Sequence, residues 1–212
     1  MTIAIPRLDR STAAQNGLTL ADFLVPIRVA ERLGTRVRHL VLVVAGAAFV
    51  ALTAQIFIPT LPVPFTGQTF GVLVVGGALG FRRGLLALLL YLAIGLLGLA
   101  VFAQGASGLG TLTGPSGGYL IGFVVAAAVV GRLAELGWDR RIGGALVMMA
   151  IGTAVIYAIG VPWLKAVTGY SWSDALAGGM TKFLVWDAAK LAIAAGIFPA
   201  AWWLIGRRPE DR

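Results

Sequence analysis

Long apolar stretches, each near the length of a membrane-spanning helix, recur along this chain and limit what it can fold into. A helix needs about 20 apolar residues to cross the roughly 30 Å hydrocarbon core of a bilayer. Short connecting segments, which contain arginine or are rich in Gly and Pro, separate the stretches. They predict an all-α integral membrane protein, a bundle of six transmembrane helices. The expected spans are 39–57, 68–81, 84–102, 117–133, 142–164 and 181–205.

The composition makes the bilayer the solvent for most of the chain. Of the 212 residues, 58% are hydrophobic and only 12% are charged, whereas soluble domains carry about 25% charged residues. A soluble fold of this size could not bury so much apolar surface. We therefore expect a membrane domain at 39–206 and a cytoplasmic C-terminal tail at 207–212. The segment 1–38 is expected to be a cytoplasmic tail or an interfacial helix.

The second expected span is too short to cross a bilayer unaided. Its fourteen residues would reach only about 21 Å at 1.5 Å per residue. Either the preceding segment IPTLPVPFTG dips into the membrane or the bilayer thins locally. Irregular backbone is tolerated at that depth only where protein or water covers it. The shortfall is therefore a first sign of a cavity.

The basic residues predict the orientation of the bundle. The net charge is +8, but the arginines lie at the ends of apolar segments and not on one polar face, which argues against nucleic acid binding. If both termini are cytoplasmic, every arginine lies inside. The outer loops then contain only Lys165, with Lys182 at the start of the last span and Lys190 within it. The positive-inside rule favours this topology, as in a multi-pass protein of the bacterial inner membrane.

Three regions on the expected outer side depart from plain membrane composition. They are the loop VPFTGQTF at 63–70, the glycine-rich loop at 102–119 and the start of the last span. Dense glycines let a backbone approach a ligand closely, and the lack of a GxxxxGK[ST] pattern argues against a phosphate cradle. The polar residues near these glycines are Gln104, Thr111, Ser116 and Tyr119. They favour contact with a small ligand over simple loop flexibility.

Asp187 and Lys190 are the sharpest signal in the sequence. Residues three apart on a helix share a face, and each charge costs at least about 2.5–3.5 kcal/mol at the centre of a span. Such residues usually face a cavity or each other. Two interpretations remain open: a self-neutralising structural ion pair, or direct contact with a ligand.

The sequence offers little for catalysis. His39 is the only histidine and lies at the cytoplasmic start of the first span, so a histidine-based metal site or a Ser-His-Asp arrangement has no second or correctly placed group. The chain has no cysteine. Asp187 is the only acid within a span, so paired-carboxylate chemistry is also missing. We expect no enzyme activity, metal or cofactor.

Four motifs together resemble the BioY family, the biotin-specific substrate-binding (S) components of energy-coupling factor (ECF) transporters. They are VPFTGQTFGVLVVGGALG (63–80), RRGLLALLLYLAIGLLGLAVFAQG (82–105), LTGPSGGYLIGF (112–123) and FLVWDAAKLAIA (183–194). The departures are Ser116, where such proteins often have Thr, and Gln104 beside Gly105, where a Gly pair is common. The first 38 residues carry no family signal.

The resemblance implies a six-helix S component with cytoplasmic termini that binds biotin beneath its first and third outer loops. It implies that Asp187 contacts the ureido N–H groups and Lys190 an acceptor oxygen of biotin, with Phe65, Tyr119 and Trp186 as walls. The implied biotin-binding residues are Phe65, Thr66, Gln68, Gln104, Gly105, Gly117, Gly118, Tyr119, Trp186, Asp187 and Lys190.

The resemblance also implies partners. Such subunits join a transmembrane coupling protein and two cytoplasmic ATPases, and in similar S components a small-residue motif of the first span contacts the coupling protein. Ala47 and Ala51 match that motif here, although such pairs also serve internal packing. The chain contains no Walker motif, so any ATP hydrolysis belongs to the partners.

Other functions stay open on the residues alone. The chain could be an S component or carrier for another small vitamin, a membrane enzyme acting on a lipid head group, or a scaffold that transports nothing. The single intramembrane acid argues against the enzyme. A scaffold would tolerate apolar replacement of Asp187 and Lys190 without losing any ligand response.

The expected topology can be tested directly because the native chain has no cysteine. Arg82, Arg140 and both termini are predicted to be cytoplasmic, and Ser107 and Ser171 to lie outside. Single cysteines at positions 107 and 140 are treated with a membrane-impermeant thiol reagent on intact cells. We expect labelling at 107 only. Labelling at 140 but not at 107 would overturn the orientation.

Overall fold

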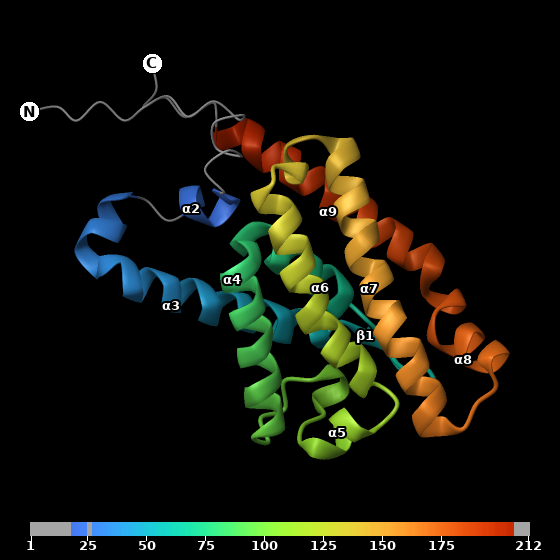
Figure 1. Ribbon diagram of the computed structural model, residues 1–212. Coiled ribbons are helices and arrows are strands. Elements are labelled where there is room, and N and C mark those ends of the chain that lie inside the picture. Colours follow the sequence, from blue (N-terminus) through green and yellow to red (C-terminus); the bar gives the residue numbers. More distant parts are fainter. Residues whose placement is uncertain (1–17, 25–26, 206–212) are drawn as a thin grey trace, which may run out of the picture.

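The structure is a computed structural model that describes residues 18–24 and 27–205, and it is almost entirely helical (Figure 1). The main helices are α2 (Leu20–Leu24), α3 (Ile27–Ala54), α4 (Gln68–Leu96), α6 (Gly117–Glu135), α7 (Ile142–Thr168), α8 (Trp172–Gly179) and α9 (Leu184–Ile205). The short elements are β1 (Phe57–Ile58), β2 (Phe65–Thr66), η1 (Ala103–Gly105), α5 (Leu109–Thr113), η2 (Trp138–Arg140) and η3 (Thr181–Phe183).

Five segments of the described chain are long and apolar enough to cross a membrane. They are Arg36–Ala54, Gln68–Leu96, Gly117–Glu135, Ile142–Thr168 and Trp172–Ile205. The expectation of an all-helical membrane protein is therefore confirmed. The expected spans at 68–81 and 84–102 both fall in α4, which ends at Leu96. Of the expected tails, residues 1–17 and 207–212 lie outside the described residues.

Helix α4 is not straight, because the chain reverses at Gly80. This residue has φ +82° and ψ −178°, a backbone conformation that only glycine adopts readily. Gln68 Nε2 lies 2.6 Å from the Tyr91 hydroxyl, although 23 residues of straight helix would separate them by about 35 Å. The arms 68–79 and 81–96 therefore lie side by side.

Side chains satisfy the backbone groups that the reversal at Gly80 leaves unpaired. Arg83 Nε donates to the Leu79 carbonyl at 2.9 Å, and the Phe81 N–H donates to Glu135 Oε1 at 2.9 Å. An unsatisfied backbone group in a bilayer costs several kcal/mol. The break in α4 is thus built into the fold and ties it to the end of α6.

The helices pack in a chain of neighbours in which α4 contacts α3 and α6, α7 contacts α6, and α9 contacts α7. Two apolar clusters fill the interior. One is centred on Tyr91, Phe102, Phe123 and Ile156, and the other on Phe198 with Met148 and Met149. The first cluster surrounds the cavity described below, while the second closes the opposite half of the bundle.

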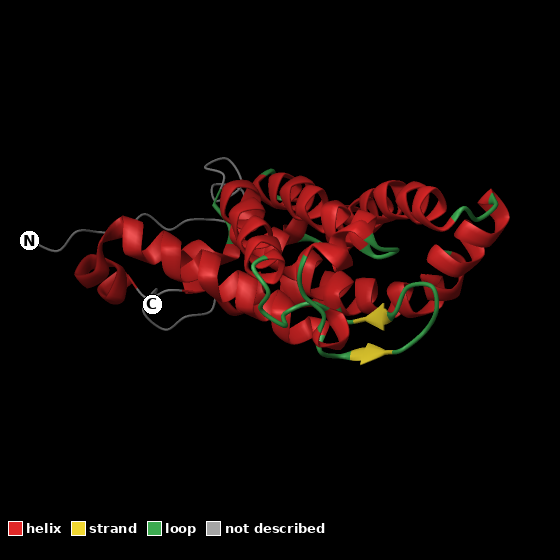
Figure 2. Ribbon diagram, turned by 90° about the horizontal axis from the view of Figure 1, so that it is seen from below, coloured by secondary structure: helices red, strands yellow, loops and turns green. Residues whose placement is uncertain are grey.

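The strands β1 and β2 form a small antiparallel hairpin in which Phe57 pairs with Thr66 and Ile58 with Phe65. Figure 2 shows this hairpin at the edge of the bundle, with its connecting loop reaching towards the helices. Lys182 of η3 holds that loop, since its Nζ donates to the Leu61 carbonyl at 2.9 Å. The loop before α4 is therefore held by hydrogen bonds. The expectation that this segment dips into the membrane, or that the bilayer thins there, stays a prediction.

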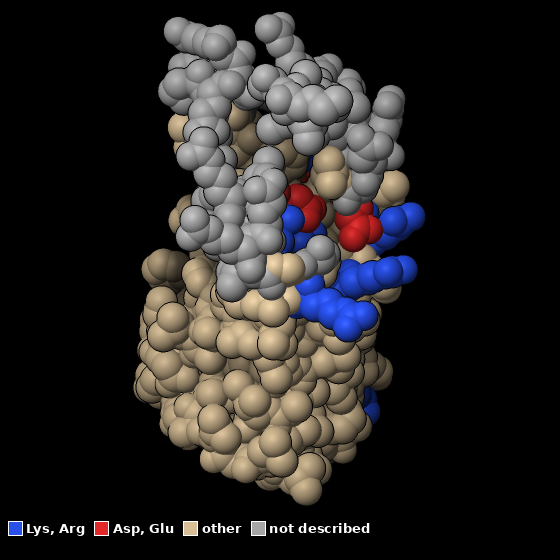
Figure 3. All heavy atoms as spheres, turned by 90° about the vertical axis from the view of Figure 1, so that its left-hand side faces the viewer, with Lys and Arg blue, Asp and Glu red and all other residues tan. Residues whose placement is uncertain are grey.

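Described arginines gather at the other end of the bundle, and Figure 3 shows basic side chains, in blue, clustered on the face that it draws. Arg83 forms an ion pair with Asp22 of α2 at 2.9 Å, and Arg140 Nη2 donates to the Leu18 carbonyl at 2.7 Å. Burial raises the pKa of the Asp22 carboxyl, but the hydrogen bonds from Arg83 and Thr19 outweigh it and the net shift is downward. The segment 18–24 is thereby docked on the bundle although it lies outside the four motifs. We call the end of the bundle that carries Arg83 and Arg140 the basic end.

Arg140 is only 8% exposed, so it is poorly placed for the labelling experiment described above. Its guanidinium stacks 3.3 Å above the Trp202 ring and lies 3.1 Å from Asp139. Arg141, the next residue, is exposed and is the better position for a cysteine. The sequence could not distinguish these two neighbours, since both are arginines in the same connecting segment.

Asp139 should make the stability of the protein depend on pH. It is fully buried, and burial raises its pKa from 3.8 to about 6 against the opposing effects of Arg140 and the Trp202 hydrogen bond. The folded state therefore holds this proton more tightly than the unfolded chain. The stability that this proton confers is present below about pH 4 and is lost as the pH rises through about 6.

We expect this group to favour the folded state at pH 5 over pH 7.5 by on the order of 1 kcal/mol. Thermal unfolding of wild type and Asp139→Asn in detergent at both pH values isolates the effect. The gain on acidification should be smaller in the variant, which cannot titrate at this position. Equal gains in both proteins would contradict the assignment.

Candidate functional site

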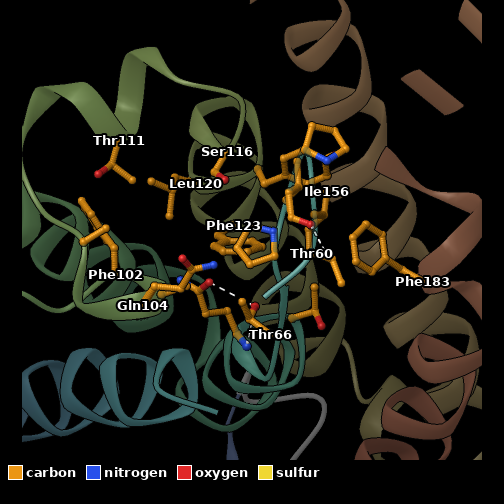
Figure 4. A pocket seen from close by; sticks show the side chains of 18 of the residues that line it. Thr60, Thr66, Phe102, Gln104, Thr111, Ser116, Leu120, Phe123, Ile156 and Phe183 are labelled. Carbon is orange, nitrogen blue, oxygen red and sulfur yellow. Dashed lines mark hydrogen bonds between the residues drawn. The ribbon is translucent and has the colours of Figure 1, made fainter. Parts of the chain in front are cut away.

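A cavity of about 260 Å³ lies between the loops at 59–64 and 102–116 and the helices beneath them. Figure 4 shows side chains from the two loops, β2, α6, α7 and η3 surrounding one space. The volume is near the lower end of the roughly 300–1,000 Å³ usual for ligand pockets. The cavity therefore suits a small molecule.

The cavity wall combines apolar side chains with polar groups from several elements. The apolar side chains are Val63, Phe102, Leu120, Phe123, Ile156 and Phe183. Polar groups of the loop 102–116 are Gln104, Thr111 and Ser116. Those of β2 and the helices are Thr66, Gln68, Thr69, Tyr119, Tyr157, Asp187 and Lys190. Apolar walls with a few convergent polar groups are typical of small-ligand sites.

Asp187 is the centre of the polar network at the helix side of the cavity. It is 6% exposed, and its Oδ1 lies 3.0 Å from Lys190 Nζ and 3.4 Å from Thr69 Oγ1. The Tyr157 hydroxyl of α7 donates to Asp187 Oδ2. The carboxylate thus has a partner on each oxygen, as a buried charge requires.

Lys190 is equally well satisfied. Its Nζ donates to the Thr66 carbonyl at 2.8 Å, to Thr69 Oγ1 at 3.1 Å and to Asp187 Oδ1 at 3.0 Å, which uses all three of its protons. It also lies 4.1 Å from the centre of the Phe65 ring. The pair Asp187 and Lys190 therefore joins α9 to the junction of β2 with α4.

Gln68 positions the first turn of α4 against the second arm. Its Nε2 donates to the Tyr91 hydroxyl, and its Oε1 accepts from Thr66 Oγ1 at 3.1 Å. Tyr91 in turn donates to the Val101 carbonyl at 3.2 Å. The chain of hydrogen bonds links β2, both arms of α4 and the start of the loop 102–116.

Two further hydrogen bonds hold α6 and the loop before it against the later helices. The Tyr119 hydroxyl donates to the Gly179 carbonyl of α8 at 2.8 Å, and Trp163 Nε1 donates to the Gly114 carbonyl at 3.0 Å. The glycine-rich loop is therefore anchored at its end, next to Ser116. Its glycines provide close contact as well as freedom of movement.

The structure brings together six of the eleven binding residues expected from the sequence. Those that line the cavity are Thr66, Gln68, Gln104, Tyr119, Asp187 and Lys190. The remaining five, which do not line it, are Phe65, Gly105, Gly117, Gly118 and Trp186. Apart from Tyr119, the lining members come from the loop 102–116, the start of α4 and the first turns of α9.

The five remaining residues have other positions. Phe65 stacks on Phe183 at 5.8 Å between ring centres and contacts Trp186 edge-on at 5.9 Å, and Trp186 is 60% exposed. Gly117 and Gly118 are buried, and an added Cβ would collide with the Leu112 carbonyl of α5 at Gly117 and with Trp163 of α7 at Gly118. Gly105 follows Gln104, and both have positive φ. These residues support the cavity from behind or shape its loop.

The sequence analysis missed most of the apolar wall and one central polar group. Phe123, Ile156 and Tyr157 all lie inside long apolar stretches, where a residue facing a cavity has the same composition as one facing lipid. Tyr157 did carry a signal, because a hydroxyl in the middle of an apolar span usually has a partner when buried. The described residues contain no group of three His, Asp or Glu side chains that could hold a metal ion.

A helical membrane bundle with a small amphipathic cavity under two anchored loops is a solute-binding membrane protein. The BioY family model matches residues 26–207, so the chain belongs to the BioY family. The resemblance inferred from the four motifs is confirmed. The match begins at residue 26, so the expectation that the first 38 residues carry no family signal was wrong for residues 26–38.

Individual relatives agree with this assignment. Biotin transporter BioY2 of Lactococcus lactis subsp. cremoris is 36% identical over 170 residues, covering 79% of this chain and 91% of the relative. Biotin transporter BioY of Thermotoga maritima is 39% identical over 152 residues, covering 70% and 86%. The crystal structure of the S-component for biotin from an ECF-type ABC transporter matches with a TM-score of 0.70 and 26% identity, covering 78% of this chain and 90% of that chain. The fold is thus that of an S component.

Proposed function

We propose that the 260 Å³ cavity binds biotin and that the chain captures this vitamin as the S component of an ECF-type transporter. Its named relatives are biotin transporters and the matching crystal structure is a biotin S component. Family membership makes the chain a multi-pass membrane transport protein and not an enzyme. The observation that carries the assignment to this cavity is the Asp187–Lys190–Tyr157 network on its wall.

The chemistry of biotin suits a cavity whose wall combines apolar side chains with polar groups. Biotin has a ureido group with two N–H donors and a carbonyl acceptor, an apolar bicycle, and a chain that ends in a carboxylate. We assign the ureido N–H groups to Asp187, whose second oxygen accepts only one hydrogen bond from the protein. Contact with Lys190 requires an exchange, because its three protons already have partners.

The cavity is proposed to open to the outside of the cell. Arg83 and Arg140 lie at the basic end, and the cavity lies at the other end beside Lys182. The positive-inside rule then places the basic end in the cytoplasm. A solute arriving from outside would meet the loops at 59–64 and 102–116 first.

We further propose that α4 crosses the membrane twice, so that the bundle has six crossings. Each arm is shorter than a full span, at about 18 Å for 68–79 and about 24 Å for 81–96. The hairpin Phe57–Thr66 and the ordered loop after Leu96 extend the protein beyond the arms. Hydrogen bonds within these segments, such as that from the Gly67 N–H to the Ile56 carbonyl at 2.8 Å, supply partners for their backbone groups, as irregular backbone in a membrane requires.

The energy for uptake is proposed to come from a transmembrane coupling protein with two cytoplasmic ATPases. Ala47, which the sequence analysis assigned to the coupling-protein contact, is 2% exposed and lies in the core, and Ala51 is half-buried against it. The outward face of α3 carries Val44, Ala48 and Leu52 instead. We therefore move the proposed contact to that face, where Ala48 keeps the small size that close helix approach needs.

The alternative that the cavity binds another small vitamin can be tested with the purified protein. A panel of vitamins added to the purified protein should raise its thermal unfolding temperature only for biotin. Stabilisation by a different vitamin, with none by biotin, would reassign the substrate and leave the fold assignment unchanged.

The biotin assignment predicts a large affinity loss when the charged pair is removed. Asp187→Asn with Lys190→Met removes both charges together and leaves neither one buried alone. Losing a buried charged contact to a ligand typically costs about 2–5 kcal/mol, which is about 30-fold or more in affinity. Biotin affinity is measured by calorimetry on protein that elutes as a single species in detergent.

The matched control is Lys165→Met, which removes a lysine that does not line the cavity and lies over Trp172 at 5.3 Å. It should bind biotin as the wild type does. Unchanged affinity in the double variant would leave the pair as a structural ion pair. A loss of biotin binding in the control as well would point to general damage at the outer end.

The partner contact predicts that bulk on the outward face of α3 separates binding from uptake. Ala48→Trp should lower partner-dependent biotin uptake in cells while the purified variant keeps its biotin affinity. Ala192→Trp, an exposed alanine of α9, is the control and should leave uptake intact. If Ala48→Trp transports normally, the proposed contact lies elsewhere.

A further inference from the structure

An open groove of about 1240 Å³ lies between α3, the second arm of α4 and the end of α6. Its floor is formed by Val43 and Leu79, which are buried. Its sides are the exposed residues Leu40, Leu86 and Leu89. The groove is far larger than the 260 Å³ cavity and shares no residue with it.

The apolar part of the groove matches one leaflet of a bilayer in length. Leu86, Leu89, Leu90 and Ala93 line it from one side of α4, with the helical spacing that places residues three and four apart on one face. From Arg82 to Ala93 the helix rises about 16 Å. Half of a roughly 30 Å hydrocarbon core is about 15 Å, so an extended acyl chain fits along this wall.

The groove ends in a cluster of basic side chains at the basic end of the molecule. Arg82, Arg83, Arg132 and His39 line it there, together with Glu135. Arg83 is paired with Asp22, and Arg132 is paired with Glu135 at 3.0 Å. Neither Arg82 nor His39 has a hydrogen bond or ion pair within the described part of the chain.

Arg132 remains available to a ligand despite its pairing with Glu135. Its side chain is 63% exposed, and an exposed ion pair of this kind contributes little. Glu135 is itself held in place, because its other oxygen accepts the Phe81 N–H. The mouth of the groove therefore presents an unpaired Arg82 beside a weakly held Arg132. Their combined positive charge exceeds the negative charge of the Glu135 carboxylate.

We propose that this groove is a binding site for an anionic phospholipid. The phosphate lies against Arg82 and Arg132, and one acyl chain runs along Leu86, Leu89 and Ala93. A soluble phosphate would gain nothing from the apolar wall, and a zwitterionic lipid, whose cation offsets its phosphate, would gain less from the arginines than an anionic lipid. Basic pockets between transmembrane helices on the cytoplasmic side recognise anionic head groups in this way. The site is independent of the proposed biotin site.

The proposal is tested by equilibrium binding of fluorescent phosphatidylglycerol and phosphatidylcholine to the purified full chain in mixed micelles. One arginine near a membrane surface contributes about 1 kcal/mol to binding of an anionic lipid, or about fivefold in affinity. Arg82→Gln should weaken phosphatidylglycerol about fivefold and phosphatidylcholine less, because the choline cation offsets the phosphate charge. Leu86→Trp should weaken both lipids because it fills the apolar part of the groove.

Arg141→Gln is the matched control, since Arg141 is an exposed arginine of the same end that does not line the groove. It should bind both lipids as the wild type does. Equal affinity of the wild type for the two lipids, or an equal loss in the Arg141→Gln control, would overturn the proposal. Competition by glycerol phosphate as strong as that by phosphatidylglycerol would show a simple anion site instead.

A protein partner is the remaining alternative occupant of the groove. If Arg82→Gln binds both lipids normally but fails in partner-dependent uptake, the groove docks the coupling protein and the lipid proposal fails. Biotin affinity serves as the folding check and should not change in any of these variants.

Discussion

The reversal of the chain at Gly80 is the constraint on which the rest of the structure depends. It lays the two arms of α4 together, so that Gln68 reaches Tyr91 at one end and Arg83 and Glu135 meet the broken backbone at the other. The first contact fixes the start of α4, where Thr66 accepts from Lys190. The second set of contacts, made by Arg83 and Glu135, forms part of the wall of the groove at the basic end. Both candidate sites therefore exist because a glycine adopts a positive φ that other residues avoid.

Charge is distributed in this molecule according to the cost of burying it. At the basic end Arg83 and Arg140 reach carboxylates or carbonyls. At the cavity the charges of Asp187 and Lys190 are satisfied by each other and by Tyr157 and Thr69. Removing one member of such a pair leaves an uncompensated buried charge. This explains why replacing both residues together distinguishes a role in ligand binding from a role in folding.

The sequence predicted the features of the fold that hydrophobic periodicity and the placement of charged residues determine. The long apolar stretches predicted the membrane-spanning segments. The arginines predicted a common basic end, and the contacts of Arg83 and Arg140 with the segment 18–24 support it. The spacing of Asp187 and Lys190 identified the polar centre of the cavity. The sequence did not reveal that Arg140 is buried while Arg141 is exposed, because that depends on how Trp202 returns from the far end of the chain. The expected ligand role of Gly117 and Gly118 stays a prediction, and the structure shows that their small size permits close contact with the Leu112 carbonyl of α5 and with Trp163 of α7.

The hydrogen-bond count at the cavity gives the two charged residues different roles towards a ligand. Every proton of Lys190 already has an acceptor, whereas Asp187 Oδ2 accepts from Tyr157 alone and each carboxylate oxygen can accept more than one hydrogen bond. The helix side of the cavity therefore has acceptor capacity to spare and no free lysine proton. It suits the N–H donors of a ureido group. An acceptor on the ligand would have to displace the Thr66 carbonyl or Thr69 from Lys190, and the Thr66 carbonyl belongs to the hairpin that carries the loop 59–64. A ligand that replaced the Thr66 carbonyl on Lys190 would therefore release one contact of the hairpin that carries the loop over the cavity.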